Sequence, residues 1–202
     1  MRQKSRTQMD AGGAPRLAIT PPQIVGPFYP VTERPDLAAN LARPSGSADE
    51  ARGQLLYVRG RVLTCSGEPV AHARIEIWQA NAAGKYRHPS DTNPAPLDPN
   101  FRGFAQLTTD VAGRYAFRTI MPGRYPTPEG EMRPPHIHFT VEGRIDRLVT
   151  QLYFAGEPEN QTDRWLNSLA QPERLIASLQ APPSHLEMGA CVAQFDIVLP
   201  SG

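Results

Sequence analysis

Short segments in which apolar and polar residues alternate recur along most of the chain, and they predict β-strands. Leu56, Val58 and Val62 alternate with polar positions, and Ile75 and Ile77 repeat the pattern. Because successive side chains of a strand point to opposite faces, each segment has one face to bury. Similar segments cover 104–108, 114–119, 147–154 and 195–199. The sequence is therefore mainly β and predicts an antiparallel β-sandwich.

Turn and helix signals set the expected connections. The residues from Thr109 to Gly113 separate two alternating segments, which predicts a hairpin in which Tyr115 and Phe117 share one face. Only residues 161–180 have apolar positions at helical spacing, and Pro172 suits the first turn of a helix. We therefore expect a short helical segment near 161–180.

Two irregular stretches, at about 80–100 and 121–135, are long for loops of a compact domain. Loops of that length usually carry function or are disordered. The N-terminal quarter lacks the alternating pattern. We expect a disordered tail over 1–18, an extended, Pro-rich arm over 19–54, and the β-sandwich domain with its long active-site loops over 55–200.

Composition narrows the class of protein. The 22 prolines and 16 glycines among 202 residues are too many for a helical protein. A net charge of +1 without a basic run makes nucleic acid and membrane surfaces poor partners. Cys65 and Cys191, the two cysteines, indicate neither a disulfide framework nor a zinc–thiolate site. With no apolar leader or membrane-length segment, we expect a cytoplasmic protein.

His136 and His138 alternate with Ile137, Phe139 and Val141 in one predicted strand. The two imidazoles therefore share the face opposite the core, with Cα atoms about 6 to 7 Å apart, close enough for both rings to bind one metal ion. Two histidines on the wet face of a strand would give the same pattern. The pair points to a metal only if further ligands cover it.

Tyr86 and Tyr125 lie in the two long stretches, which would bring them to the histidine face if they fold over it. A phenol has a pKa of about 10 and must lose its proton to bind a metal, so it is a poor ligand for zinc or magnesium. Ferric iron is small, hard and highly charged, and it prefers anionic oxygen. Two imidazoles and two tyrosinates therefore favour Fe(III), although either tyrosine alone is more typical of packing.

Six short motifs carry a resemblance that covers about residues 20 to 200. They are Gly26-Pro27-Phe28-Tyr29, Glu76-Ile77-Trp78-Gln79-Ala80-Asn81, Gly84-Lys85-Tyr86-Arg87-His88, Asp98-Pro99-Asn100-Phe101-Arg102-Gly103, Pro122-Gly123-Arg124-Tyr125-Pro126 and Arg133-Pro134-Pro135-His136-Ile137-His138. Together they resemble the intradiol ring-cleavage dioxygenases, and among these the protocatechuate 3,4-dioxygenase chains. In that family two tyrosinates and two histidines hold a non-haem Fe(III) ion. The resemblance places these ligands at Tyr86, Tyr125, His136 and His138, with Tyr125 and His138 as the axial pair.

The resemblance also implies an activity. A catechol would bind as a dianion, and Tyr125 would leave the iron and take one of its protons. Arg133 would lie over the substrate ring as a fixed cation, and Gln151 would lie behind the ligands. Both atoms of O2 would enter the substrate, with protocatechuate-like catechols favoured, to give a cis,cis-muconate-type diacid. The resemblance further implies a homo-oligomer, or a hetero-oligomer with a related chain.

Two other classes fit parts of the pattern. Gly130, His136, His138 and Glu142 match the first half of a cupin metal motif, in which two histidines and one carboxylate hold a ferrous ion. The later glycine of that motif is replaced here by Val149. The strands also resemble transthyretin-like β-sandwich modules, which only bind or space other domains. Iron content and colour would separate the three.

Overall fold

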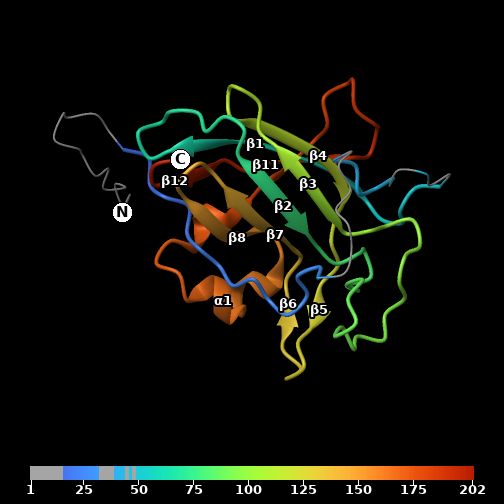
Figure 1. Ribbon diagram of the computed structural model, residues 1–202. Helices are drawn as coiled ribbons and strands as arrows, with labels where there is room; N and C mark the ends of the chain where they lie inside the picture. The colour runs from blue at the N-terminus through green and yellow to red at the C-terminus, as the bar shows by residue number, and fades with distance from the viewer. Residues whose placement is uncertain (1–15, 32–38, 44–45, 47–48) are drawn as a thin grey trace.

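The computed structural model describes residues 16–31, 39–43, 46 and 49–202. Two five-stranded sheets and a small hairpin make up the fold (Figure 1). The first sheet contains β1 (Leu55–Thr64), β4 (Arg114–Ile120), β10 (Leu179–Gln180), β11 (Cys191–Gln194) and β12 (Ile197–Leu199). The second has the order β3 (Phe104–Thr108), β2 (Arg74–Trp78), β7 (His136–Glu142), β8 (Arg147–Phe154) and β9 (Ile176–Ala177). The hairpin consists of β5 (Tyr125–Pro126) and β6 (Met132–Arg133).

The two sheets share one hydrophobic core, which confirms the predicted mainly β sandwich. Val58 of β1 and Phe117 of β4 come from the first sheet, and Ile77 of β2 and Phe139 of β7 come from the second. All four side chains are buried, and the rings of Phe117 and Phe139 lie 6.0 Å apart. Most strand pairs are antiparallel, but β1 pairs in parallel with β11 and β12, as β8 does with β9. In the second sheet β7 is the middle strand, between β2 and β8.

The predicted hairpin around residues 109–113 is wrong, although the turn itself forms. The Gly113 amide donates to the Asp110 carbonyl at 3.0 Å, and the Asp110 amide donates to the Arg114 carbonyl at 3.0 Å. β3 nevertheless pairs with β2, whereas β4 pairs with β1 in the other sheet. Alternation tells which face of a strand is buried and not which strand lies beside it, so the crossing between sheets leaves no signal in the pattern.

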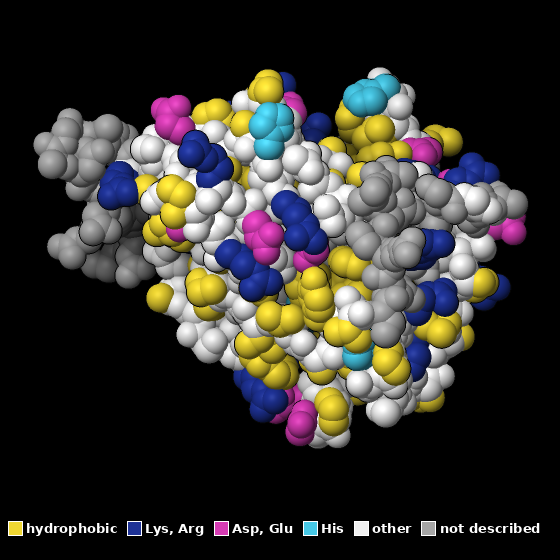
Figure 2. All heavy atoms as spheres, in the orientation of Figure 1, with side chains coloured by type: hydrophobic (Ala, Val, Ile, Leu, Met, Phe, Trp, Pro, Cys, Tyr) yellow, Lys and Arg dark blue, Asp and Glu magenta, His cyan; other side chains and the backbone are white. Residues whose placement is uncertain are grey.

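The N-terminal arm is closely attached to the sandwich. Of the predicted disordered tail, residues 1–15 lie outside the described residues. The amides of Thr20 and Gln23 donate to carbonyls of β12 and β8, at 3.0 and 2.8 Å. Further along, Leu41 and Ala42 are fully buried in the core, which we did not expect of the arm. Hydrophobic side chains gather where the arm crosses the face shown in Figure 2, and exposed Ile24 belongs to this arm.

Residues 158–175 form three short helical turns beside the second sheet. They are η1 (Pro158–Gln161), α1 (Arg164–Asn167) and η2 (Pro172–Leu175). Pro172 stands in the first turn of η2, as predicted. Asp163 caps α1 by accepting a hydrogen bond from the Leu166 amide at 2.8 Å. Within the described part of the chain, no helix has the length and apolarity needed to cross a membrane.

Candidate metal centre

Strand β7 places His136 and His138 on the face opposite the core, and that face is covered. Ile137 and Phe139 enter the core, whereas the two imidazoles point the other way and are each 2 % exposed. The N-terminal arm supplies part of the cover. A side chain at Gly26 would place its Cβ 3.2 Å from the His138 ring, and Gly26 has a φ of +75° that favours glycine. The histidines are therefore enclosed residues and not surface ones.

Three polar atoms converge on one point between β7 and the β5–β6 hairpin. The Nε2 atoms of His136 and His138 lie 3.2 Å apart, and the Tyr125 Oη lies 3.3 Å from the His136 Nε2. Two ligand atoms that each make a bond of about 2.1 Å, at an angle of about 100°, are separated by this distance. The three atoms can therefore share one metal ion without rearrangement of the backbone.

Tyr86 reaches the same place from the long loop that follows β2. The Tyr86 amide donates to the Asp91 carboxylate at 2.7 Å, which fixes the loop around it. The rings of Tyr86 and Tyr125 then meet edge to face, with centroids 5.3 Å apart. The Tyr86 Oη is buried without a hydrogen-bond partner among the described residues. A buried hydroxyl without a partner is costly, so this oxygen is suited to be a ligand of a metal ion.

Gly84 explains how the two tyrosine loops come so close together. A Cβ at this position would lie 2.2 Å from the Arg124 carbonyl oxygen, and its φ of +78° lies in the left-handed region. Only glycine tolerates both conditions without a shift of the backbone. The residues on either side of this contact, Tyr86 and Tyr125, are therefore held together by backbone packing.

Electrostatics at the site oppose ionisation of all four groups when no cation is present. Burial lowers the pKa of His136 and His138 well below the usual value, and the charge of Arg133 adds to this effect. Burial raises the pKa of Tyr86 and of Tyr125, although Arg133 opposes the rise for Tyr125. Neutral imidazoles are ready to bind a metal, whereas the phenols need a highly charged cation to lose their protons. The donor set thus fits Fe(III) better than Zn(II) or Mg(II).

Neighbouring groups orient the two imidazoles. The His136 Nδ1 lies 2.7 Å from the Pro134 carbonyl, which requires a donor at Nδ1 and so leaves the Nε2 lone pair free. Trp78 of β2 stacks on His138, with centroids 4.8 Å apart and planes inclined by 8°. Trp78 therefore holds the His138 ring in place by packing.

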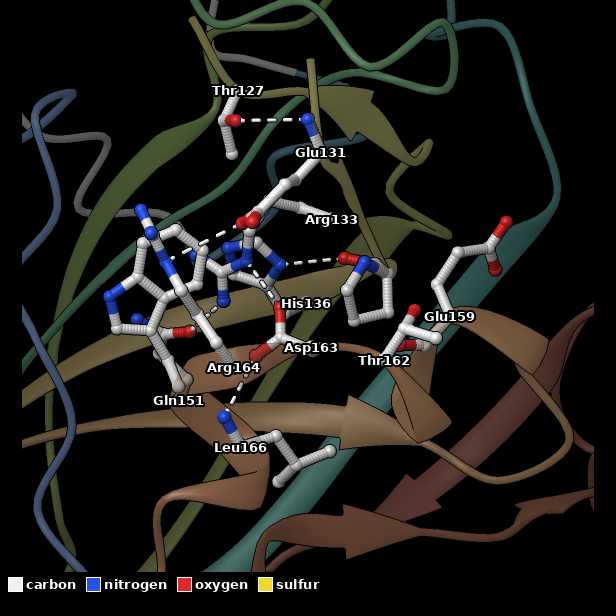
Figure 3. A network of polar contacts seen from close by, with 12 residues as sticks. Thr127, Glu131, Arg133, His136, Gln151, Glu159, Thr162, Asp163, Arg164 and Leu166 are labelled. Atoms are coloured by element: carbon white, nitrogen blue, oxygen red, sulfur yellow. Dashed lines mark hydrogen bonds and ion pairs between the residues drawn. The ribbon is translucent and has the colours of Figure 1, made fainter. Parts of the chain in front are cut away.

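Arg133 is tied into a buried network beside the histidines (Figure 3). Its Nε donates to Asp163 at 2.6 Å, and its Nη2 donates to the Gln151 Oε1 and the Tyr153 Oη, both at 3.0 Å. Its guanidinium carbon also lies 4.2 Å from the centre of the Trp165 ring. Gln151 in turn donates to the Ile24 carbonyl of the arm at 2.9 Å. Arg133 and Gln151 thus contact each other beside the convergent atoms, and their roles toward a substrate stay predictions.

Asp163 and Trp165 are site residues that the sequence did not reveal. An aspartate before a short helical segment signals an N-cap, and Asp163 does cap α1. The same carboxylate also pairs with Arg133, 30 positions away, and that second contact has no local signal. Its side chain is completely buried, so it neutralises the arginine without exposure to water.

A cavity of about 260 Å³ adjoins Arg133 between β6 and α1. Its walls are formed by Glu131, Met132, Arg133, Thr162, Asp163, Arg164 and Trp165. A larger hollow, of about 490 Å³, lies over β1 and β4 of the first sheet and is lined by exposed arginines. The histidines belong to the other sheet, so the smaller cavity is the one next to the candidate metal centre.

The cupin alternative is wrong for this chain. Glu142 forms ion pairs with Arg74 and Arg147 at 3.5 and 3.0 Å, at the far end of β7 from His136. Glu142 lies four positions along the strand from His138, a distance of roughly 13 Å. Among the residues that the structure describes, no three His, Cys, Asp or Glu side chains cluster as a metal site. The candidate site therefore depends on the two tyrosine oxygens as well as on the histidines.

Known proteins are similar to this chain over most of its length. The family model described as "Dioxygenase" matches residues 24–201. The protocatechuate 3,4-dioxygenase beta chain of Burkholderia cepacia is 41% identical over 179 residues, which cover 86% of this chain and 76% of that protein. Catechol 1,2-dioxygenase 2 of Acinetobacter lwoffii is 35% identical over 69% of this chain. It is matched over only 52% of its own length.

Solved structures agree with the sequence matches. The dioxygenase domain of a dioxygenase–carbohydrate-binding fusion from Streptomyces sp. SirexAA-E superposes with a TM-score of 0.70 at 27% identity, over 92% of this chain and all of that one. Catechol 1,2-dioxygenase from Acinetobacter sp. ADP1 superposes with a TM-score of 0.68 at 28% identity, over 90% of this chain and 63% of that one. These matches overturn the transthyretin-like alternative. The chain belongs to the intradiol ring-cleavage dioxygenase family.

Proposed function

We propose that this chain is a non-haem Fe(III) enzyme that cleaves a catechol-type ring between its two hydroxylated carbons. Tyr86, Tyr125, His136 and His138 would hold the ion. The observation that carries the proposal is that the His138 Nε2 and the Tyr125 Oη lie 3.2 and 3.3 Å from the His136 Nε2, beside the buried Tyr86 hydroxyl, which has no partner among the described residues. A ferric ion bound there would supply a Lewis acid for the two substrate oxygens.

Tyr125 would act as the proton acceptor. It stands directly opposite Arg133 in the register of β5 and β6, so it faces the side on which the cavity opens. Its Oη would take the proton of one substrate hydroxyl and hold it during the reaction. Tyr86 is enclosed by its own loop and would stay in place. The two tyrosines would thus have different tasks.

Arg133 and the arm would shape the reaction site. Arg133 is held by Asp163, Gln151 and Tyr153, so its charge is fixed in position before any substrate arrives. A fixed cation favours negative charge that develops on a substrate beside it. The arm covers His138 and binds Gln151, and it would keep bulk water away from the site.

The overall reaction would add both atoms of O2 to one catechol and give a cis,cis-muconate-type diacid. Among catechols we favour protocatechuate, because the relative at 41% identity bears that substrate in its name. Catechol and hydroxyquinol appear in the names of other relatives, at 35% and 31% identity. The substrate panel for a test therefore contains these three compounds.

Iron content, colour and oxygen uptake test the proposal. Purified protein should contain about one iron per chain and show a visible tyrosinate-to-iron absorption band. Added protocatechuate should cause oxygen uptake with one O2 consumed per substrate and a diacid as the product. Colourless protein that takes up no iron on reconstitution would contradict the proposed centre. Coloured protein that consumes no O2 with any compound of the panel would contradict the proposed reaction.

We also propose an assembly and a location. The name of the 41% identical relative refers to a beta chain, and we propose that this chain likewise assembles with itself or with a related chain. The exposed apolar residues Ile19, Ile24 and Val25 of the arm support such a contact. Light scattering on the purified chain should give a mass above the 22.2 kDa of one chain. A cytoplasmic location stays a prediction from the sequence.

A further inference from the structure

Arg133, beside the convergent atoms, has its Nε and Nη2 donors already engaged. Its side chain is 4% exposed, and it binds Asp163, Gln151 and Tyr153. The buried Asp163 carboxylate is its counter-ion at 2.6 Å. An anionic group on a substrate would have to compete with that ion pair, and breaking a buried pair is costly. Arg133 is therefore poorly placed to bind a second carboxylate.

Two other arginines near the site in sequence, Arg124 and Arg144, point elsewhere. Arg124 precedes Tyr125, so its side chain leaves the strand on the opposite face, where it pairs with Glu159 at 2.5 Å. Arg144 is exposed in the turn after β7, beyond Glu142 and at the far end of that strand from His136. Neither side chain lines the cavity beside Arg133.

Arg164 is the arginine that lines this cavity and keeps an available charge. It is the first residue of α1, and its side chain is 55% exposed. Its guanidinium carbon lies 4.3 Å from the centre of the Trp165 ring, which orients the group without neutralising it. Its ionic contact is with Glu131, at 3.5 Å, and that carboxylate is also 55% exposed. Such a loose surface pair contributes little and exchanges easily.

The two arginines lie at a distance that one substrate can span. Both guanidinium carbons contact the ring of Trp165, at 4.2 and 4.3 Å from its centre, so they are no more than about 8.5 Å apart, the sum of those distances. A substituted aromatic ring that lies beside Arg133 can therefore direct a substituent towards Arg164. Figure 3 shows Glu131 extending from the β5–β6 hairpin towards Arg164, and both residues line the cavity.

We propose that Arg164 determines specificity by binding an anionic substituent, such as a carboxylate, on the ring of the catechol. The inference rests on the proposed function. In the absence of substrate, Glu131 occupies the guanidinium loosely. A ring carboxylate displaces Glu131 and forms a two-point contact with Arg164, as planar guanidinium groups do with carboxylates. A neutral catechol makes no such contact, so Arg164 distinguishes the two substrates.

Dissociation constants measured without oxygen test this role. Iron-loaded protein is titrated with protocatechuate and with catechol under argon, using the change in the visible band. Arg164→Gln should weaken protocatechuate binding by about 10- to 100-fold, the usual effect of losing a hydrogen bond between charged groups, and change catechol binding less than about twofold. Glu131→Gln should strengthen protocatechuate binding, because the competing carboxylate is gone.

Arg147→Gln is the matched control, because Arg147 is 59% exposed and pairs with a glutamate, Glu142, far from the cavity. It should change neither dissociation constant. Equal weakening of both ligands by Arg164→Gln would show a purely structural role and overturn the inference, as would an unchanged protocatechuate constant. Binding that follows the expected pattern without oxygen uptake in air would support the role of Arg164 and contradict the proposed reaction.

Discussion

Tyr86 and Tyr125 have the same side chain but different surroundings. Tyr86 sits in a loop that Asp91 and the glycine contact at Gly84 hold rigidly. Tyr125 belongs to a two-residue strand of a small hairpin, directly opposite Arg133. Arg133 lines the cavity of about 260 Å³, so Tyr125 is the tyrosine whose paired residue opens onto that space, as its proposed role as proton acceptor requires. This contrast makes the two tyrosines separable by mutation.

Tyr125→Phe should keep much of the bound iron, lose most of the intensity of the visible band and lose most turnover. The other three proposed ligands would still hold the ion, but the proposed proton acceptor and one phenolate would be gone. Iron analysis, absorption spectra and oxygen uptake measure the three effects. Tyr115→Phe is the control, because Tyr115 is also buried but lies on β4 of the other sheet. Unchanged turnover in Tyr125→Phe would refute its role as proton acceptor.

Asp163→Asn should destabilise the fold by about 3–5 kcal/mol, since it leaves the buried charge of Arg133 without a counter-ion. The neutral side chain can still cap α1, so the loss reports mainly on the ion pair. Urea denaturation of both proteins measures the difference. Glu131→Gln breaks an exposed pair with Arg164 and should cost less than about 1 kcal/mol. Similar losses for both variants would argue against a special role for the buried pair.

The strands could be read from the sequence because alternation is a local property. Both faces of β7 were foreseen in this way, with Phe139 in the core and His136 on the opposite side. The crossing of the chain between β3 and β4 could not be read, since it depends on which strands meet after folding. The same holds for Asp163 and Arg133, whose contact joins α1 to β6. The sequence motifs supplied the candidate site residues, whereas the contacts that support them could be found only from the fold.

The contact between β4 and the end of β11 gives a prediction for alkaline pH. The Tyr115 hydroxyl donates to the Phe195 carbonyl at 2.6 Å, and burial raises the pKa of Tyr115 well above its usual value. The folded protein therefore keeps this proton at a pH where the unfolded chain loses it. The stability from Tyr115 is complete below about pH 10, the pKa in the unfolded chain, and is lost as the pH rises from there towards the folded pKa.

Tyr115→Phe should therefore reduce stability at pH 8 by about 1 kcal/mol, the contribution of one hydrogen bond. Above pH 10 its stability should fall less steeply than that of the wild type, by up to about 1.4 kcal/mol per pH unit, because one titrating group is missing. Urea denaturation at several pH values between 8 and 11 gives both numbers. Parallel pH profiles for the two proteins would show that Tyr115 ionises equally well in the folded state.

At the scale of the whole molecule, the candidate metal centre joins segments that are distant in the sequence. The loop after β2, the β5–β6 hairpin, β7 and the N-terminal arm all meet there, at Tyr86, Tyr125, His138 and Gly26. The segments bring several polar groups into a dry region, and the Tyr86 hydroxyl finds no partner among the described residues. An ion that satisfies these groups would stabilise the folded state and not merely permit catalysis.

Removal of iron should therefore lower the melting temperature. A ligand present at 100 times its dissociation constant adds about 2.7 kcal/mol, which corresponds to roughly 5 to 10 °C for a chain of this size. Calorimetry of the iron-loaded protein and of the same protein after chelation measures the shift. His138→Ala should abolish the shift, whereas His185→Ala, a change at an exposed histidine, should preserve it. If iron raises the melting temperature of His138→Ala as much as that of the wild type, the ion binds elsewhere. A preserved shift in His185→Ala together with its loss in His138→Ala would link the ion to β7, because the two variants differ only in which imidazole they remove.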